Sequence, residues 1–202
     1  MTVQATARRL LPPFVRAAGG PVADWQGRLD PAEALAIRNA VDARRMEFVA
    51  GRVAARAALA GFGQAGSLPR RPDGPPEWPA GFTGSIAHGG GACLAAVARL
   101  TDVGALGVDL ERVGALASDL ASEILTDQEL ALLAGADPTR AFCAKEAGYK
   151  AQFMLTGRIL GFHDLIVVPT DDGFQVTAPD HRMRVKLAET AGLIIAATWI
   201  AR

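Results

Sequence analysis

The 202-residue sequence has only two cysteines, no excess of charge of either sign, and no apolar run long enough to cross a bilayer. Cys93 and Cys143 lie within apolar runs, which favours reduced thiols over a disulfide framework. The longest apolar stretch, residues 193–201, is too short for a transmembrane helix and is interrupted by Thr198. The N-terminal segment has no apolar core of the signal-peptide kind. We therefore expect a cytoplasmic protein without membrane partners.

Charge is balanced, because lysine plus arginine number 21 and aspartate plus glutamate also number 21. No global field therefore directs the chain to nucleic acid or to acidic lipid, and any phosphate binding must come from a local cluster. The sequence contains no dinucleotide or Walker pattern, no Cys/His spacing typical of zinc, and no nucleophile elbow. Hydrophobic residues make up 50% of the chain, enough for the core of one domain or of two small halves.

The first local cluster is a pair of carboxylates, Asp109 and Glu111, in an expected strand. Side chains alternate along a strand, so in residues 107–111 (Gly-Val-Asp-Leu-Glu) the apolar residues share one face and both carboxylates share the other. At this spacing one divalent cation can bridge the two carboxylates. An isolated Asp-x-Glu is most often an exposed strand face, so the metal interpretation depends on a second acidic motif.

That second motif is Glu146, on a helix expected over about residues 139–155. Glu146 falls on the same stripe as three aromatic residues, Phe142, Tyr149 and Phe153. A carboxylate there is costly to bury unless a metal or a cation compensates it. Lys145 and Lys150 flank it, although an exposed helix with a Glu-to-Lys pair is the simpler alternative. Three carboxylates with two lysines predict a magnesium site that handles phosphate groups.

Basic residues are densest on an earlier expected helix, at Arg44, Arg45, Arg52 and Arg56. They form either a solvated helix face or a clamp for a phosphate monoester, because guanidinium groups pair bidentately with phosphate oxygens. His88 is a further candidate, since the three glycines that follow it allow a backbone or a ligand to approach closely.

Helical and strand patterns each occur twice along the chain. A capping box at residues 30–33 begins a helical region that continues to about residue 60, with a break near Val41, and residues 64–84 are expected to form a loop. Residues 86–100 and 103–113 predict an antiparallel strand pair joined at residues 101–102. Helical regions are expected over 118–133 and 139–155, and strands over 165–168, 174–177, 183–187 and 193–199. This order predicts an α+β fold of two halves, residues 1–102 and 103–202, with a cleft between them.

Four segments carry a family resemblance in the order in which they occur. They are residues 44–52 (Arg-Arg-Met-Glu-Phe-Val-Ala-Gly-Arg), 78–88 (Trp-Pro-Ala-Gly-Phe-Thr-Gly-Ser-Ile-Ala-His), 107–111, and 142–150 (Phe-Cys-Ala-Lys-Glu-Ala-Gly-Tyr-Lys). Together they resemble the 4'-phosphopantetheinyl transferases of the surfactin-synthetase type, in particular the branch that includes the enterobactin-synthetase enzyme. Each segment alone is a weak signal, and four in order are specific. Residues 151–202 match no motif.

The resemblance implies two pseudo-symmetric α+β halves with coenzyme A bound between them. The metal ligands implied for magnesium on the pyrophosphate are Asp109, Glu111 and Glu146. Lysines implied to contact the phosphates are Lys145 and Lys150. Residues implied to bind the nucleotide end, including the 3'-phosphate, are Arg44, Arg52, Arg70 and His88.

The implied reaction transfers the 4'-phosphopantetheine arm of coenzyme A to a serine of an acyl or peptidyl carrier protein and releases adenosine 3',5'-bisphosphate. Glu146, supported by Lys150, would take the serine proton, and the enzyme is expected to be a monomer. One departure is Ala87, where the family usually has Ser or Thr, and the missing hydroxyl would weaken a phosphate contact by about 1 kcal/mol. The alternatives are a non-catalytic module that binds coenzyme A or a carrier protein, and another magnesium-dependent phosphoryl-transfer or hydrolytic enzyme.

Overall fold

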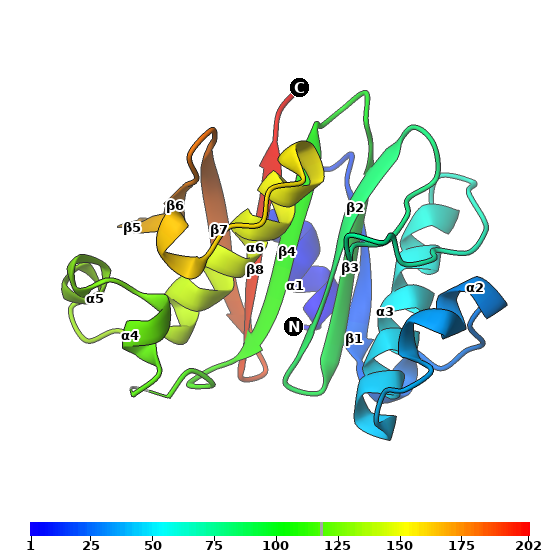
Figure 1. Cartoon of the computed structure of the whole chain (residues 1–202), viewed down its shortest axis with the longest axis horizontal. Coiled ribbons are helices and arrows are strands. Elements are labelled where there is room, and N and C mark those ends of the chain that lie inside the picture. The colour runs from blue at the N-terminus through cyan, green and yellow to red at the C-terminus, as the bar shows by residue number, and fades with distance from the viewer. Residues whose placement is uncertain (118) are drawn as a thin grey trace.

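The computed structural model of the chain describes residues 1–117 and 119–202. Its strands form two antiparallel sheets that lie side by side (Figure 1). The three-stranded sheet has the order β1-β3-β2 and consists of β1 (Arg16–Pro21), β2 (Phe82–Gly89) and β3 (Ala92–Arg99). The five-stranded sheet has the order β4-β8-β7-β6-β5 and consists of β4 (Ala105–Arg112), β5 (Ile166–Thr170), β6 (Gly173–Thr177), β7 (Arg182–Thr190) and β8 (Leu193–Ile200).

One long helix packs on each sheet, α3 (Asp42–Ala60) on the three-stranded sheet and α6 (Thr139–Thr156) on the five-stranded sheet. The shorter helices are α1 (Val3–Leu10), α2 (Pro31–Ala34), α4 (Ala121–Ile124) and α5 (Asp127–Leu133), with 3-10 turns η1 (Val22–Asp24), η2 (Leu35–Ile37) and η3 (Phe162–Asp164). This is the predicted α+β architecture of two halves. None of the helices in the described part of the chain is long and apolar enough to cross a membrane.

The capping boxes predicted from the sequence are present and explain where two helices begin. Asp30 and Glu33 cap α2, while Thr126 and Glu129 cap α5. The long helix α3 begins after Val41, at the predicted break. Residues 118–133 were expected to be one helical region and instead contain α4 and α5. Its expected first residue, Ser118, lies outside the described residues.

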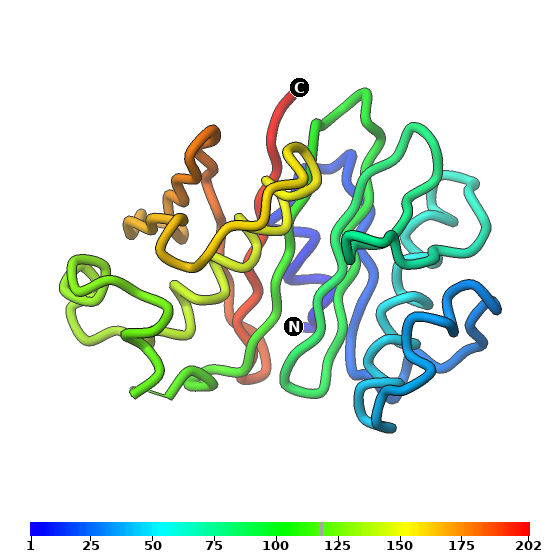
Figure 2. The backbone as a smooth tube through the Cα atoms, in the orientation of Figure 1, coloured from blue at the N-terminus to red at the C-terminus, as the bar shows by residue number. Residues whose placement is uncertain are grey.

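The prediction of one strand over residues 86–100 is wrong, because the chain reverses direction in the middle of it (Figure 2). Gly90 and Gly91 have φ angles of +55° and +80°, the left-handed values that a two-residue hairpin turn needs and that glycine adopts without strain. The segment therefore folds into the β2–β3 hairpin, with His88 paired to Cys93. Two of the three glycines that suggested close approach to a ligand therefore form this turn, and the third, Gly89, is the last residue of β2.

The predicted pairing of residues 86–100 with residues 103–113 is also wrong. β3 is the central strand of its sheet, with β1 on one side and β2 on the other, so it has no free edge for β4. β4 instead pairs with the C-terminal strand β8, which places Asp109 opposite Ala196. Helix α1 and strand β1 were not predicted, and α1 packs against strands of both sheets. The division of the chain near residue 102, in the connection between β3 and β4, stays a prediction.

The two sheets meet along their edge strands β2 and β4. Ser85 on β2 accepts a hydrogen bond at its Oγ from the Val108 backbone N–H (3.1 Å). A Cβ atom on Gly89 would lie 2.1 Å from the Leu110 carbonyl oxygen, so only glycine allows this approach. Apolar residues of α1, β2, β3, β4 and β8 form one core cluster behind the junction. Small residues at the junction thus bring the two halves, and the residues they carry, close together.

Candidate functional site

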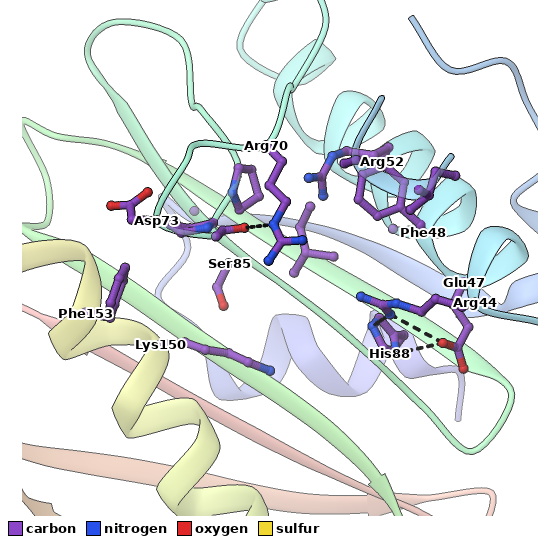
Figure 3. A pocket seen from close by; sticks show the side chains of 18 of the residues that line it. Arg44, Glu47, Phe48, Arg52, Arg70, Asp73, Ser85, His88, Lys150 and Phe153 are labelled. Carbon is purple, nitrogen blue, oxygen red and sulfur yellow. Dashed lines mark hydrogen bonds and ion pairs between the residues drawn. The ribbon is translucent and has the colours of Figure 1, made fainter. Parts of the chain in front are cut away.

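A cleft of about 410 Å³ lies where α3, β2 and α6 meet (Figure 3). Both halves of the chain line it. The charged and polar residues around it are Arg44, Glu47 and Arg52 from α3, Ser85 and His88 from β2, Lys150 from α6, and Arg70 and Asp73 from the loop of residues 64–81. Aromatic side chains on its wall include Phe48, Tyr149 and Phe153. The cleft is therefore basic on the side of α3 and carries Lys150 on the side of α6.

The acidic residues of β4 lie under α6, on the face that strand alternation predicted. Leu106, Val108 and Leu110 are buried in the core behind the sheet, which leaves Asp109 and Glu111 on the α6 side. Helix α6 approaches this face closely because Gly107 has no side chain: a Cβ there would lie 1.9 Å from the Ala147 carbonyl oxygen. This contact places Glu146, the neighbour of Ala147, beside the two carboxylates of β4.

Burial and the charge of Asp109 raise the pKa of the two other carboxylates, Glu111 and Glu146. Burial, then the charge of Asp109, raises the pKa of Glu111 to about 7, with Glu146 adding to the effect and Lys150 opposing it. Burial and Asp109 likewise raise the pKa of Glu146. Like charges in a poorly solvated place disfavour ionisation, and a nearby cation relieves this. The negative charge of the cluster of Asp109, Glu111 and Glu146 is therefore only partly compensated by the surrounding residues.

Lys150 supplies part of that compensation. Its Nζ lies 2.6 Å from Asp109 Oδ1. Burial alone would lower the pKa of Lys150, but the charge of Asp109 and this hydrogen bond outweigh it and raise the pKa. The other oxygen, Asp109 Oδ2, is buried and has no hydrogen-bond partner among the described residues. An unpartnered carboxylate oxygen inside a cluster of negative charge is a suitable ligand for a cation.

The donor set fits a hard divalent cation such as magnesium, which prefers carboxylate oxygens and keeps other positions for water and phosphate. Within residues 1–117 and 119–202, however, no three His, Cys, Asp or Glu side chains are grouped closely enough to hold a metal ion. The side chains of Asp109, Glu111 and Glu146 are thus neighbours that have not converged on one point. The three-carboxylate magnesium site stays a prediction.

Lys145 faces away from the cleft, which corrects the expectation that it contacts phosphate. Its side chain is fully buried, and Nζ lies 2.9 Å from Glu129 Oε2 and 2.9 Å from each of the carbonyl oxygens of Ile124 and Phe162. An ammonium group has three N–H donors, so none remains for a ligand. Successive helix residues differ by about 100° in direction, and Lys145 therefore faces α5 while Glu146 faces β4.

The cluster of four arginines on α3 divides between two roles. Arg45 donates to the Ile37 carbonyl oxygen (2.9 Å) and Arg56 pairs with the capping residue Glu33 (2.7 Å), so both hold the α2 region against α3. Arg52 lines the cleft, where its Nε donates to the Leu68 carbonyl oxygen (2.8 Å) and burial lowers its pKa to about 10. The expectation of one phosphate clamp is therefore wrong for Arg45 and Arg56, and for Arg44 and Arg52 it stays a prediction.

Arg44, Arg70 and His88 complete the basic wall with Arg52. Arg70 is held by a hydrogen bond from its Nε to the Gly74 carbonyl oxygen (3.1 Å). Arg44 contacts His88 Nε2, and Glu47 contacts both residues (Figure 3). Glu47 was not predicted to be a site residue, although its position one helical turn after Arg44 was a usable signal. Ala87, by contrast, is buried in the core behind the junction and does not line the cleft.

A second, smaller hollow of about 230 Å³ lies next to Glu146. Its wall is mainly apolar and includes Tyr149, Leu160, Phe162 and Leu165 together with Lys145 and Glu146. The segment that follows α6 forms much of this wall, and because it carries no motif it was not predicted to line the site. The hollow can hold an uncharged part of a ligand whose charged part lies in the main cleft.

Two family descriptions match the chain. Residues 32–98 match the 4'-phosphopantetheinyl transferase N-terminal domain, and residues 105–193 match the 4'-phosphopantetheinyl transferase superfamily. Among curated proteins, the chain is 37% identical over 159 residues to 4'-phosphopantetheinyl transferase Svp of Streptomyces mobaraensis, covering 74% of this chain and 65% of Svp. It is 35% identical over 150 residues to 4'-phosphopantetheinyl transferase Npt of Nocardia iowensis, covering 71% of this chain and 68% of Npt.

A third relative, 4'-phosphopantetheinyl transferase PptT of Mycobacterium tuberculosis, is 38% identical over 141 residues, which cover 66% of this chain and 62% of PptT. The chain thus spans about two thirds of the length of these relatives. Among solved structures, the holo-[acyl-carrier-protein] synthase of Helicobacter pylori in complex with coenzyme A aligns with a TM-score of 0.38 and 19% identity, over 46% of this chain and 96% of that chain.

Proposed function

The chain belongs to the 4'-phosphopantetheinyl transferase superfamily, and we propose that it transfers the 4'-phosphopantetheine arm of coenzyme A to a serine of an acyl or peptidyl carrier protein. Adenosine 3',5'-bisphosphate leaves in this reaction. The observation that carries the proposal is the arrangement of residues around one cleft. Its wall on α3 and β2 is basic. Across the cleft, Lys150 is hydrogen-bonded to Asp109, which lies beside two further carboxylates.

The nucleotide end of coenzyme A is assigned to the basic wall. Arg44, Arg52, Arg70 and His88 line the cleft on this side, and guanidinium groups pair strongly with phosphate oxygens. Four basic groups suit the 3'-phosphate, which carries more charge than a phosphodiester. The loop of residues 64–81, which brings Arg70 to the cleft, lies over the same end.

The pyrophosphate is assigned to the junction of β4 and α6. Lys150 donates to its oxygens, and Asp109, Glu111 and Glu146 would hold magnesium. Bound there, magnesium supplies charge neutralisation and polarisation of the phosphoryl group. Excess negative charge in this cluster and the unpartnered Oδ2 of Asp109 support the assignment. The apolar hollow of Tyr149, Phe162 and their neighbours would take the pantetheine arm.

Glu146 is the proposed base that accepts the proton of the carrier serine hydroxyl as its oxygen attacks the phosphorus that bears the pantetheine arm. Burial raises the pKa of Glu146, which favours proton acceptance, and the residue belongs to the acidic cluster and also lines the apolar hollow. The bond from that phosphorus to the bridging oxygen breaks, and the nucleotide leaves with the bridging oxygen.

Intact-protein mass spectrometry of an apo carrier protein tests the proposal directly. The carrier is incubated with this protein, coenzyme A and magnesium, beside a Glu146→Gln control and a sample containing EDTA. We expect the carrier to gain the mass of one phosphopantetheine arm, on its serine, only with the unaltered protein and magnesium. Coenzyme A binding without any gain across several carriers would instead indicate a binding module. Thermal stabilisation by ATP but not by coenzyme A would indicate another phosphoryl-transfer enzyme.

A further inference from the structure

Glu47 places a negative charge within the basic wall, where an anionic ligand would meet repulsion. It lies on α3, one turn after Arg44, and its side chain is 34% exposed. Glu47 Oε2 lies 3.3 Å from His88 Nδ1 and 3.4 Å from Arg44 Nη1 (Figure 3). One carboxylate oxygen therefore contacts two of the residues to which the nucleotide end is assigned.

The partners of the His88 ring indicate where its proton lies. Arg44 Nη1 contacts the ring nitrogen Nε2, and a guanidinium group can only donate, so Nε2 accepts. A neutral ring that accepts at Nε2 carries its hydrogen on Nδ1, and Glu47 Oε2 lies 3.3 Å from this nitrogen. Burial, followed by the charge of Arg44, lowers the pKa of His88 and favours this neutral form, while Glu47 opposes the shift. Glu47 thus contacts the ring at Nδ1 and Arg44 contacts it at Nε2.

We propose that Glu47 is a positioning residue that holds His88 and Arg44 facing the cleft and thereby sets a preference for coenzyme A with its 3'-phosphate over the form that lacks it. This inference rests on the proposed function, because it assumes that the basic wall binds the nucleotide end. An arriving phosphate monoester takes the Arg44 donor away from Nε2. The ring, with Glu47 still beside Nδ1, binds a proton from solvent at Nε2, and the resulting imidazolium donates a hydrogen bond from Nε2 to the phosphate.

A simpler account, in which Glu47 only repels anions, predicts the opposite result. Removing its charge would then tighten the binding of coenzyme A. In the positioning account the same change weakens binding, because the imidazolium form loses its carboxylate partner and Arg44 loses a constraint on its direction. The loss of one charge-assisted hydrogen bond corresponds to a weakening of about ten-fold. The sign of the effect therefore separates the two accounts.

The experiment measures the affinities of coenzyme A and of 3'-dephospho-coenzyme A by calorimetry, in magnesium, for the full chain and for Glu47→Gln. We expect Glu47→Gln to bind coenzyme A about ten-fold more weakly and to bind the dephosphorylated form within about two-fold of the unaltered protein. Glu77→Gln is the matched control, because Glu77 is exposed on the loop of residues 64–81 and does not line the cleft. This control should leave both affinities unchanged.

A double variant shows whether Glu47 acts through the histidine. If it does, Glu47→Gln should weaken coenzyme A binding much less in a His88→Gln background than in the unaltered protein. Additive losses, tighter coenzyme A binding, or equal weakening for both ligands would each overturn the inference. Failure of the unaltered protein to bind coenzyme A would overturn the proposed function as well. If the unaltered protein transfers phosphopantetheine to a carrier serine, and Glu47→Gln prefers coenzyme A over 3'-dephospho-coenzyme A as strongly as the unaltered protein does, this inference alone is overturned.

Discussion

Replacing Lys145 with methionine tests the position that the structure gives to this lysine. The ammonium group makes three hydrogen bonds of 2.9 Å, to the Glu129 carboxylate and to the carbonyl oxygens of Ile124 and Phe162, and the side chain is fully buried. Methionine is a flexible side chain that fills similar space but donates no hydrogen bond. The change therefore leaves Glu129, itself only 2% exposed, without its cationic partner.

The expected cost follows from what Glu129 retains. Removing one member of a buried ion pair typically costs about 3–5 kcal/mol. Glu129 keeps hydrogen bonds of 2.8 Å from the backbone N–H groups of Thr126 and Val167. We therefore expect the free energy of unfolding to fall by about 3 kcal/mol, at the lower end of this range. A chain of this size loses about 2–4 °C of Tm for each kcal/mol, which gives a fall of roughly 10 °C. Urea unfolding followed by circular dichroism measures the free energy directly.

Two companion variants make this test specific. Lys186→Met removes a lysine that lies over the Trp199 ring at 5.6 Å, and it should cost less than about 1 kcal/mol. Adding Glu129→Gln to Lys145→Met should recover part of the loss, because no buried charge is then unpaired. The reasoning is refuted if Lys145→Met changes the unfolding free energy by less than about 1 kcal/mol and mainly raises the KM for coenzyme A, since that result would assign the lysine to the ligand.

Three further predictions follow from the site and its supports. Glu146→Gln should reduce kcat much more than coenzyme A affinity, and equal losses would indicate a purely metal-binding role. Burial raises the pKa of Glu129, but hydrogen bonds from Lys145 and from two backbone N–H groups outweigh it and lower the pKa. A depressed carboxyl pKa contributes stability above its usual value of 4.5 that is lost as the pH falls through the folded value. The urea midpoint should therefore fall more steeply below pH 4.5 for the unaltered protein than for Glu129→Gln. Gly107→Ala would set a Cβ 1.9 Å from the Ala147 carbonyl oxygen, and it should cost about 1–3 kcal/mol in thermal unfolding and reduce transfer by displacing α6.

Short-range features of the chain were predictable because they depend on neighbouring residues. The capping boxes at Asp30 and Thr126 determine where two helices begin, and alternation along β4 places Asp109 and Glu111 on one face. Helix α6 lies within about a residue of its predicted span. Four ordered motifs were enough to indicate the family. A missed signal was also local, since two adjacent glycines, Gly90 and Gly91, suit a tight hairpin turn.

Other features were decided by contacts between residues distant in the sequence. β4 cannot pair with β3 because β1 and β2 already occupy both edges of β3, and it pairs instead with the distant strand β8, which no local pattern encodes. The directions of Lys145 and Glu146 follow from how α6 packs on β4, where Gly107 admits Ala147, and Lys145 then meets Glu129 of α5. Periodicity places side chains around one helix, but only packing against other elements decides which direction is the core, which is the cleft, and which ion pairs form.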